Sequence, residues 1–144
     1  MARIIVADDE RNIAMVLEAV LEQDGHTVEK AHDGRAALNL MRSGPVLPDL
    51  VLLDLFMPCM SGKAVVETMR DDSYLRHIPV VIITGSTLNG RGFPAAGSYQ
   101  ALITKPFDLS QVLECVRGLL SPRRMAENGG GDCGYRIPQA AESA

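Results

Sequence analysis

The apolar residues of this chain fall alternately into short unbroken runs and into longer stretches with helical spacing. Each short run is bounded by turn residues or by a helical stretch, which is typical of strands that are buried on both faces. Five such strands alternate with helices, so the pattern predicts an α/β fold with a doubly wound parallel sheet and helices on both of its faces. The predicted strands are residues 3–7, 26–31, 50–54, 79–84 and 101–104.

Residues that start and stop helices flank the helical stretches. Gly25 is a good C-terminal stop for the first helix. Asp33 and Ser61 are suited to cap the second and third, and Asp108 with Gln111 resembles a capping box for the last. The predicted helices are residues 10–24, 34–43, 62–72 and 109–120.

Two segments do not fit this alternation. Residues 86–98 contain Gly90, Gly92, Pro94 and Gly97, which all oppose helix formation, so we expect a loop or a broken helix there. Residues 122–144 are rich in glycine and small polar side chains, with too few apolar groups for a core. We therefore predict one domain over residues 1–121 and a flexible C-terminal tail over residues 122–144.

Composition narrows the functional class. The net charge of −4 argues against direct nucleic-acid binding. No apolar run is long enough to cross a bilayer, and the N-terminus lacks a signal-peptide pattern, so we expect a cytoplasmic protein without membrane contact. The three widely spaced cysteines, Cys59, Cys115 and Cys133, form neither a disulfide framework nor a zinc pattern.

Polar residues end or directly follow four of the predicted strands, at the same end of each. Asp54 ends the third strand, the pair Asp8 and Asp9 follows the first, Thr84 ends the fourth and Lys105 follows the fifth. In doubly wound sheets ligands bind outside the carboxyl ends of the strands. The sequence therefore predicts one polar site at this edge of the sheet.

The chemistry of these side chains suits phosphoryl transfer. Three clustered carboxylates repel one another unless a cation joins them, and Mg²⁺ takes oxygen ligands while leaving positions for phosphate oxygens. Asp54 could then act as a nucleophile, since carboxylates form aspartyl phosphates. Lys105 would neutralise charge on the phosphoryl oxygens and the hydroxyl of Thr84 would bind a third oxygen.

With these motifs the chain resembles a receiver domain of the bacterial two-component response regulators. The resemblance covers residues 1–121 and implies a flavodoxin-like fold with strand order 2-1-3-4-5, an order taken from the family and not from the pattern. The matching residues are Asp8-Asp9, Asp54, Pro58, Gly62, Thr84 and Lys105-Pro106-Phe107, in the family's order and spacing.

The resemblance also implies a function and its partners. Asp54 would accept a phosphoryl group from a histidine kinase or a phosphotransfer protein and thereby change the binding of a downstream protein. Asp9, Asp54 and the main-chain carbonyl of Phe56 would hold the Mg²⁺, with Asp8 helping through water. Such a domain catalyses only its own phosphorylation and dephosphorylation, so we expect a signalling switch and not an enzyme.

The chain departs from the family at its usual output face. Many receivers carry tyrosine or phenylalanine three residues before the conserved lysine, where this chain has Leu102. Together with the glycine-rich segment, this predicts an atypical fourth helix. Our hypothesis is that phosphorylation acts through Thr84 to order residues 86–98 directly.

Other interpretations remain open at this point. Asp8 and Asp9 could simply cap the first helix, and Lys105 could be an ordinary exposed lysine. The chain could be a Mg²⁺-dependent phosphatase with an aspartyl nucleophile, although such enzymes generally carry a second aspartate where this chain has Phe56. It could also be a degenerate receiver that only binds proteins, although the complete set of site residues argues against this.

Overall fold

The computed structural model describes residues 2–85, 94, 95 and 97–120. In chain order the elements are β1 (Arg3–Ala7), α1 (Arg11–Gln23), β2 (Thr27–Ala31), α2 (Gly34–Arg42), β3 (Leu50–Asp54), α3 (Gly62–Asp71), β4 (Val80–Thr84), β5 (Ala101–Thr104) and α4 (Leu109–Leu120). Strands and helices alternate from β1 to β4, as the apolar pattern predicts, and β5 is the next element that the described residues form after β4.

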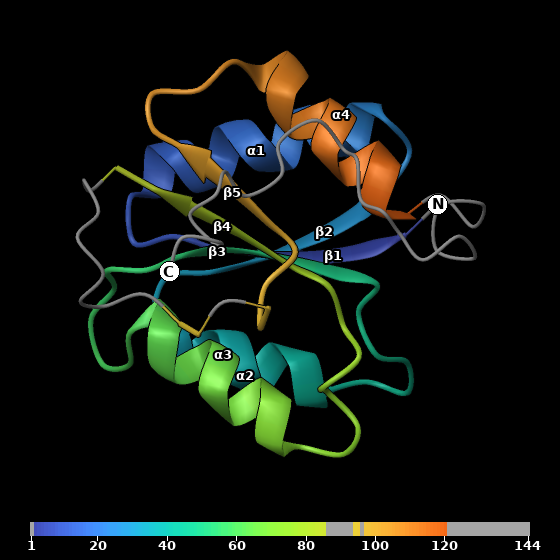
Figure 1. Cartoon of the computed structure of the whole chain (residues 1–144). Helices are drawn as coiled ribbons and strands as arrows, with labels where there is room; N and C mark the ends of the chain where they lie inside the picture. The colour runs from blue at the N-terminus through green and yellow to red at the C-terminus, as the bar shows by residue number, and fades with distance from the viewer. Residues whose placement is uncertain (1, 86–93, 96, 121–144) are drawn as a thin grey trace.

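The five strands form a single parallel sheet in the order β2-β1-β3-β4-β5. Helices α1 and α4 cover one face and α2 and α3 cover the other (Figure 1). This confirms the predicted doubly wound fold and the strand order taken from the family. The register aligns the carboxyl ends of the strands: Ala7 pairs with Leu53, and Thr84 pairs with Thr104.

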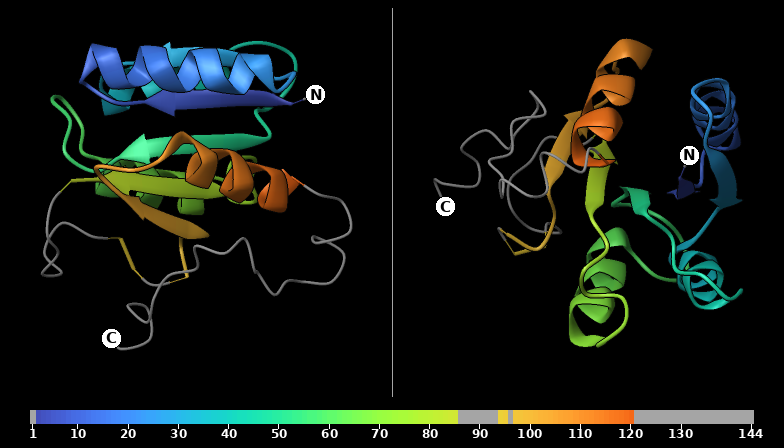
Figure 2. Two further views of the ribbon diagram at one scale, coloured as in Figure 1. Left: turned by 90° about the horizontal axis from the view of Figure 1, so that it is seen from above. Right: turned by 90° about the vertical axis from the view of Figure 1, so that its right-hand side faces the viewer.

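Because helices cover both faces of the sheet, its side chains pack into two separate hydrophobic cores, one on each face. Along β3, Val51 and Leu53 point into the core beneath α2 and α3, whereas Leu50 and Leu52 point into the core beneath α1 and α4. The right-hand view of Figure 2 shows the sheet between the two helix layers. All five residues of β3 are buried, which accounts for its unbroken apolar run.

The predicted helix ends agree with the structure. The side chain of Asp33 accepts a hydrogen bond from the Ala36 N–H at 2.7 Å, and that of Ser61 accepts one from the Ala64 N–H at 3.2 Å. Each satisfies a backbone donor that would otherwise lack a partner in the first helical turn. Gly25 follows α1 with a φ of +95°, a conformation that glycine adopts without strain.

Two sequence predictions fall largely or wholly outside the described residues. The flexible tail at residues 122–144 is one. The other is the loop or broken helix at 86–98, of which only residues 94, 95, 97 and 98 are described and are not helical. Beside them, Tyr99 is buried and Leu102 is half-buried, and both pack on the core beneath α2 and α3. No helix of the described segments is both long and apolar enough to span a bilayer.

Candidate phosphoacceptor and metal site

The carboxyl edge of the sheet brings the predicted site residues together. Asp8 follows β1, Asp54 ends β3, Thr84 ends β4 and Lys105 follows β5. Asp8, Asp54 and Thr84 are buried, although polar side chains are costly to bury without partners. Asp9, by contrast, is exposed.

Lys105 is the centre of this site. Its Nζ lies 3.0 Å from Asp8 Oδ2, 3.0 Å from Glu10 Oε1 and 3.2 Å from Asp54 Oδ2. An ammonium group has three N–H donors, and these three carboxylates match that number. Lys105 is therefore not the ordinary exposed lysine considered from the sequence.

The acidic groups crowd one another. Asp8, Asp9 and Asp54 each offer an oxygen, and these oxygens lie within 4.8 Å of one another. Burial raises the pKa of Asp54, and the charge of Asp8 raises it further, against the opposing effect of Lys105 and of the Phe56 N–H. The ionised form of Asp54 is thus destabilised in the absence of a further cation.

Burial alone would lower the pKa of Lys105, because it disfavours the charged ammonium. The hydrogen bonds to Glu10 and Asp8 and the charge of Asp54 outweigh that effect, so the pKa of Lys105 is raised. Lys105 is therefore a permanent cation at this edge of the sheet.

The loop after β3 fixes the acceptor side chain. The Phe56 N–H donates to Asp54 Oδ1 at 3.2 Å, and the Gly62 N–H donates to the Leu55 carbonyl at 2.8 Å. A Cβ at position 62 would lie 2.3 Å from the carbonyl oxygen of Asp54. Gly62 is thus required for the close approach of α3 to the backbone of the acceptor.

Thr84 and Lys105 are linked directly through the backbone. The Lys105 N–H donates to the Thr84 carbonyl at 2.9 Å, which continues the pairing of β4 with β5 beyond Thr104. The two side chains predicted to bind phosphoryl oxygens therefore start from adjacent positions on neighbouring strands.

Glu10 was missed by the sequence analysis. It is the N-cap residue of α1, yet its side chain makes no capping hydrogen bond and reaches Lys105 instead. Asp8 Oδ1 accepts from the Glu10 N–H at 2.9 Å, so Asp8 orders the turn before α1, while Glu10 occupies the N-cap position. The only available signal was a third acid in the run Asp8-Asp9-Glu10, and it did not reveal a partner 95 residues away.

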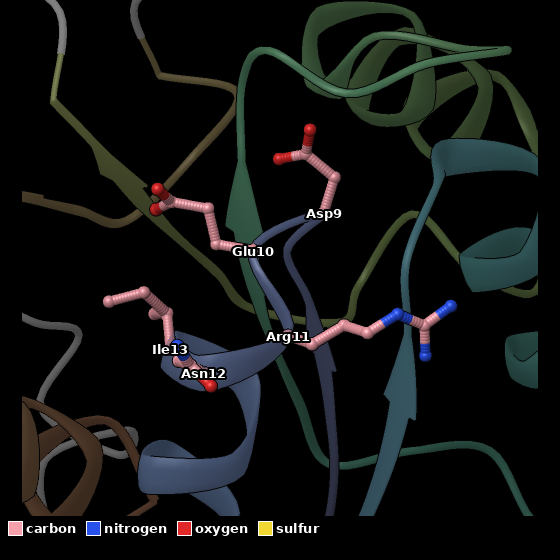
Figure 3. Close-up of a pocket in the computed structure, with 5 residues that line it drawn as sticks. All are labelled: Asp9, Glu10, Arg11, Asn12 and Ile13. Carbon is pink, nitrogen blue, oxygen red and sulfur yellow. The ribbon is translucent and has the colours of Figure 1, made fainter.

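An open hollow of about 550 Å³ adjoins the site and is lined by residues 9–13. The side chains of Asp9 and Glu10 extend from the turn after β1, whereas Arg11 extends away from Glu10 (Figure 3). The acidic site therefore has an open approach from solvent.

The donor set fits a hard divalent cation. Mg²⁺ prefers oxygen ligands and commonly takes one or two carboxylates. The clustered oxygens of Asp8, Asp9 and Asp54 meet that preference, and a bound cation would oppose the effects of burial and of Asp8 that raise the pKa of Asp54.

Comparisons with known proteins agree with this geometry. The family model of the response regulator receiver domain matches residues 4–117. The response regulator PleD of Caulobacter vibrioides is 40% identical over 121 residues, which are 82% of this chain and 26% of PleD. The polar-differentiation response regulator DivK of Brucella anthropi is 32% identical over 117 residues, which are 81% of this chain and 93% of DivK.

Solved structures give the same result. The response regulator TrrA of Thermotoga maritima, in complex with Mg²⁺ and BeF, is 30% identical with a TM-score of 0.71, covering 83% of this chain and all of that one (100%). The chemotaxis response regulator CheY4 of Vibrio cholerae is 26% identical with a TM-score of 0.74, covering 83% of this chain and 99% of that one.

The family match, the sheet order and the cluster of acids around one lysine lead to the same conclusion. The chain belongs to the response-regulator receiver domains of two-component signalling systems.

Proposed function

We propose that this protein is a phosphoacceptor switch in which Asp54 is the phosphorylation site. The observation that carries the proposal is the buried Asp54 carboxylate held 3.2 Å from the ammonium of Lys105. A phosphoryl group on Asp54 would lie beside a fixed cation, which phosphoryl transfer requires.

An Asp54 carboxylate oxygen attacks phosphorus and forms a new P–O bond, while the P–N bond of a donor phosphohistidine breaks. The electron pair of that bond stays on the imidazole nitrogen of the donor. Lys105 and the Thr84 hydroxyl each bind an oxygen of the transferred group.

Magnesium completes the proposed site. Asp8, Asp9, Asp54 and the main-chain carbonyl of Phe56 would hold it, with Asp8 acting through water. When bound, Mg²⁺ would neutralise charge that develops on the phosphoryl oxygens. Support comes from the clustered carboxylate oxygens and from the Mg²⁺–BeF complex of the similar protein TrrA.

The donor would be a histidine kinase or a phosphotransfer protein, and it needs a surface next to Asp54. A groove of about 280 Å³ is lined by Lys105 of the site and continues over exposed apolar side chains. Its other lining residues are Ile13, Val16, Pro106, Phe107 and Leu109. We assign this groove to the phosphodonor, because it adjoins the site at Lys105 and offers exposed apolar side chains for contact with a protein.

The remaining parts of the proposal follow the sequence. The receiver domain spans residues 1–121, the tail spans 122–144, and the protein acts in the cytoplasm on a downstream protein. It undergoes one phosphorylation per cycle and does not turn over a separate substrate. The matched region is 26% of the length of PleD, so the activity of that whole protein is not transferred to this chain.

Intact-mass measurement after incubation with a small phosphodonor and Mg²⁺ tests the proposal. We expect one acid-resistant, base-labile phosphoryl adduct on the wild type and none on Asp54→Asn. Steady release of phosphate without an adduct would favour the phosphatase, and the absence of any adduct would favour a protein-binding module. An adduct on Asp54→Asn at the wild-type level would refute the site.

The donor groove has its own test. Val16 is 44% exposed, and Val16→Asp would place a charge in the groove while leaving the acceptor untouched. We expect slower transfer from a phosphorylated donor protein and unchanged labelling by the small phosphodonor. Val46→Asp is the matched control, because Val46 is 62% exposed and lies before β3, away from the site.

A further inference from the structure

The ion pair between Glu10 and Lys105 has no role in the phosphorylation chemistry described above. Of the three carboxylates around the Lys105 ammonium, those of Asp8 and Asp54 are buried, whereas the Glu10 side chain is 60% exposed. Glu10 is therefore the partner that water can most readily replace.

The position of Glu10 in the fold is unusual for a glutamate. N-cap positions favour residues with short side chains such as serine, aspartate and asparagine, which accept a hydrogen bond from the first turn. Glu10 forgoes such a bond, and its longer side chain reaches Lys105 at 3.0 Å.

The side chain of Glu10 is not needed to hold the turn. The Glu10 N–H donates to Asp8 Oδ1, and the Glu10 carbonyl accepts from the Ile13 and Ala14 N–H groups, each at 3.1 Å. All three bonds are made by the backbone and survive a change of side chain. Substitutions at position 10 therefore isolate the contact with Lys105.

A phosphoryl group on Asp54 needs a donor from Lys105, and all three donors are occupied in this structure. Asp8 and Asp54 lie within the buried carboxylate cluster, so Glu10 is the partner that can leave at the lowest cost. We propose that Glu10 is a counter-ion of Lys105 in the unphosphorylated state and that a phosphoryl group on Asp54 displaces it. Because the contact between Glu10 and Lys105 must then be broken, Glu10 weakens the binding of the phosphoryl group.

This inference rests on the proposed function and adds a regulatory residue to the same site. Beryllofluoride, a phosphoryl mimic, is titrated at saturating Mg²⁺ while the backbone amide of Phe56 is followed by NMR, since that N–H donates to Asp54. An exposed ion pair contributes about 0.2–1 kcal/mol, so Glu10→Gln is expected to lower the half-saturating concentration roughly 1.5- to 5-fold.

Two matched variants separate the contact from charge effects. Glu10→Asp keeps the charge, but it is one carbon shorter and suits the N-cap, so it should bind beryllofluoride more tightly than the wild type does. Glu67→Gln removes the same charge from a side chain that is 59% exposed and lies in α3, and it should behave as the wild type. Urea midpoints of all variants show whether each one is folded.

Each outcome bears on the proposal. Unchanged or weaker binding in Glu10→Gln overturns it, as does wild-type binding in Glu10→Asp or an equal gain in Glu67→Gln. If the wild type itself does not respond, or Asp54→Asn responds equally, the phosphoacceptor function fails instead. A wild-type response that Asp54→Asn abolishes and Glu10→Gln leaves unshifted removes only the role of Glu10.

Discussion

Both edges of the sheet carry charged side chains, but the two edges differ in how these charges are paired. At the amino edge, Arg3 donates to Glu29 and to the Leu40 carbonyl, and Arg70 donates to the carbonyls of Ser98 and Ile78. Charges there are paired with opposite charges or with backbone groups. Those contacts tie loops to strands, and among the buried side-chain nitrogen and oxygen atoms of the described residues only Nη2 of Arg70 lacks a hydrogen-bond partner.

At the carboxyl edge, negative charges outnumber the positive charge that pairs with them. Three carboxylates share the ammonium of Lys105, the nearby Asp9 adds a fourth, and the pKa of Asp54 is raised by burial and by Asp8. The comparison shows that the presence of charged residues does not mark the functional edge. A cluster of carboxylates that outnumbers its cations marks it, because a bound cation can compensate that excess of negative charge.

The largest effect that we expect at the carboxyl edge follows substitution of Gly62. In Gly62→Ala the new Cβ would lie 2.3 Å from the Asp54 carbonyl oxygen and 2.7 Å from Leu55 Cα, so the backbone of the acceptor must move. Overpacking costs about 1–3 kcal/mol and occasionally more, and we expect the upper end of this range together with loss of the phosphoryl adduct. Urea unfolding and intact mass measure the two effects.

Gly25→Ala is the control for that substitution. A Cβ at Gly25 meets nothing within 4 Å, and only the φ of +95° opposes it. We expect a loss of about 1 kcal/mol and normal phosphorylation. Phosphorylation of Gly62→Ala at the wild-type rate would refute the close approach.

The second prediction is that Mg²⁺ stabilises the protein through the carboxyl edge of the sheet and not through the amino edge. A ligand at 100 times its dissociation constant stabilises the native state by about 2.7 kcal/mol, so saturating Mg²⁺ should raise the urea midpoint relative to EDTA. Asp9→Asn should reduce that rise. Asp72→Asn, at the amino edge, should leave the rise unchanged, and a midpoint indifferent to Mg²⁺ in the wild type would contradict the site.

The third prediction tests the amino edge. Arg70 donates to the carbonyls of Ser98, Arg76 and Ile78 at 2.7–3.2 Å, and Arg70→Met leaves these acceptors without that partner. We expect a loss of about 2 kcal/mol in the free energy of unfolding, equal with and without Mg²⁺. Arg76→Met is the matched control, because Arg76 is exposed, and it should stay within about 0.5 kcal/mol.

The smallest expected effect is a pH dependence of opposite sign at the two edges. The N–H of Tyr74 and other donors lower the pKa of Asp72, so its contribution to stability is present above 3.8 and is lost as pH falls through the native-state pKa. The pKa of Asp54 is raised by burial, so its effect is the reverse: stability is lost as pH rises from 3.8 through the native-state pKa.

Unfolding in EDTA across this pH range measures both effects. The stability difference between the wild type and Asp72→Asn should shrink toward acid. Asp54→Asn should gain stability relative to the wild type as pH rises. Parallel curves for the two variants would contradict the contrast between the edges.

Sequence reasoning found the residues whose position depends on local pattern. Asp54, Thr84 and Lys105 stand at the ends of apolar runs, and Asp33 and Ser61 precede helical periods, so each position follows from its neighbours in the chain. The strand order came from the family, because apolar runs of similar length do not specify which strands pair.

Contacts between distant segments escaped prediction for a physical reason. Glu10 and Lys105 are separated by 95 residues, and Arg70 reaches the Ser98 carbonyl 28 residues away. Neither contact produces a periodic pattern in the sequence, since each depends on the register of the sheet and on the length of the side chain. Likewise Gly62 was recognised as part of a motif, but its contact with the Asp54 backbone required the structure.

The alternation of side chains along β3 also has a consequence for cooperativity. Val51 and Leu53 belong to one core, and Leu50 and Leu52 belong to the other. Neither helical layer can detach without exposing one side of the same strand to water, so the two halves should melt together in a single transition. The acceptor aspartate thus ends the strand whose amides we expect to be among the last to exchange with solvent, a rigid base for a side chain whose chemical state must change.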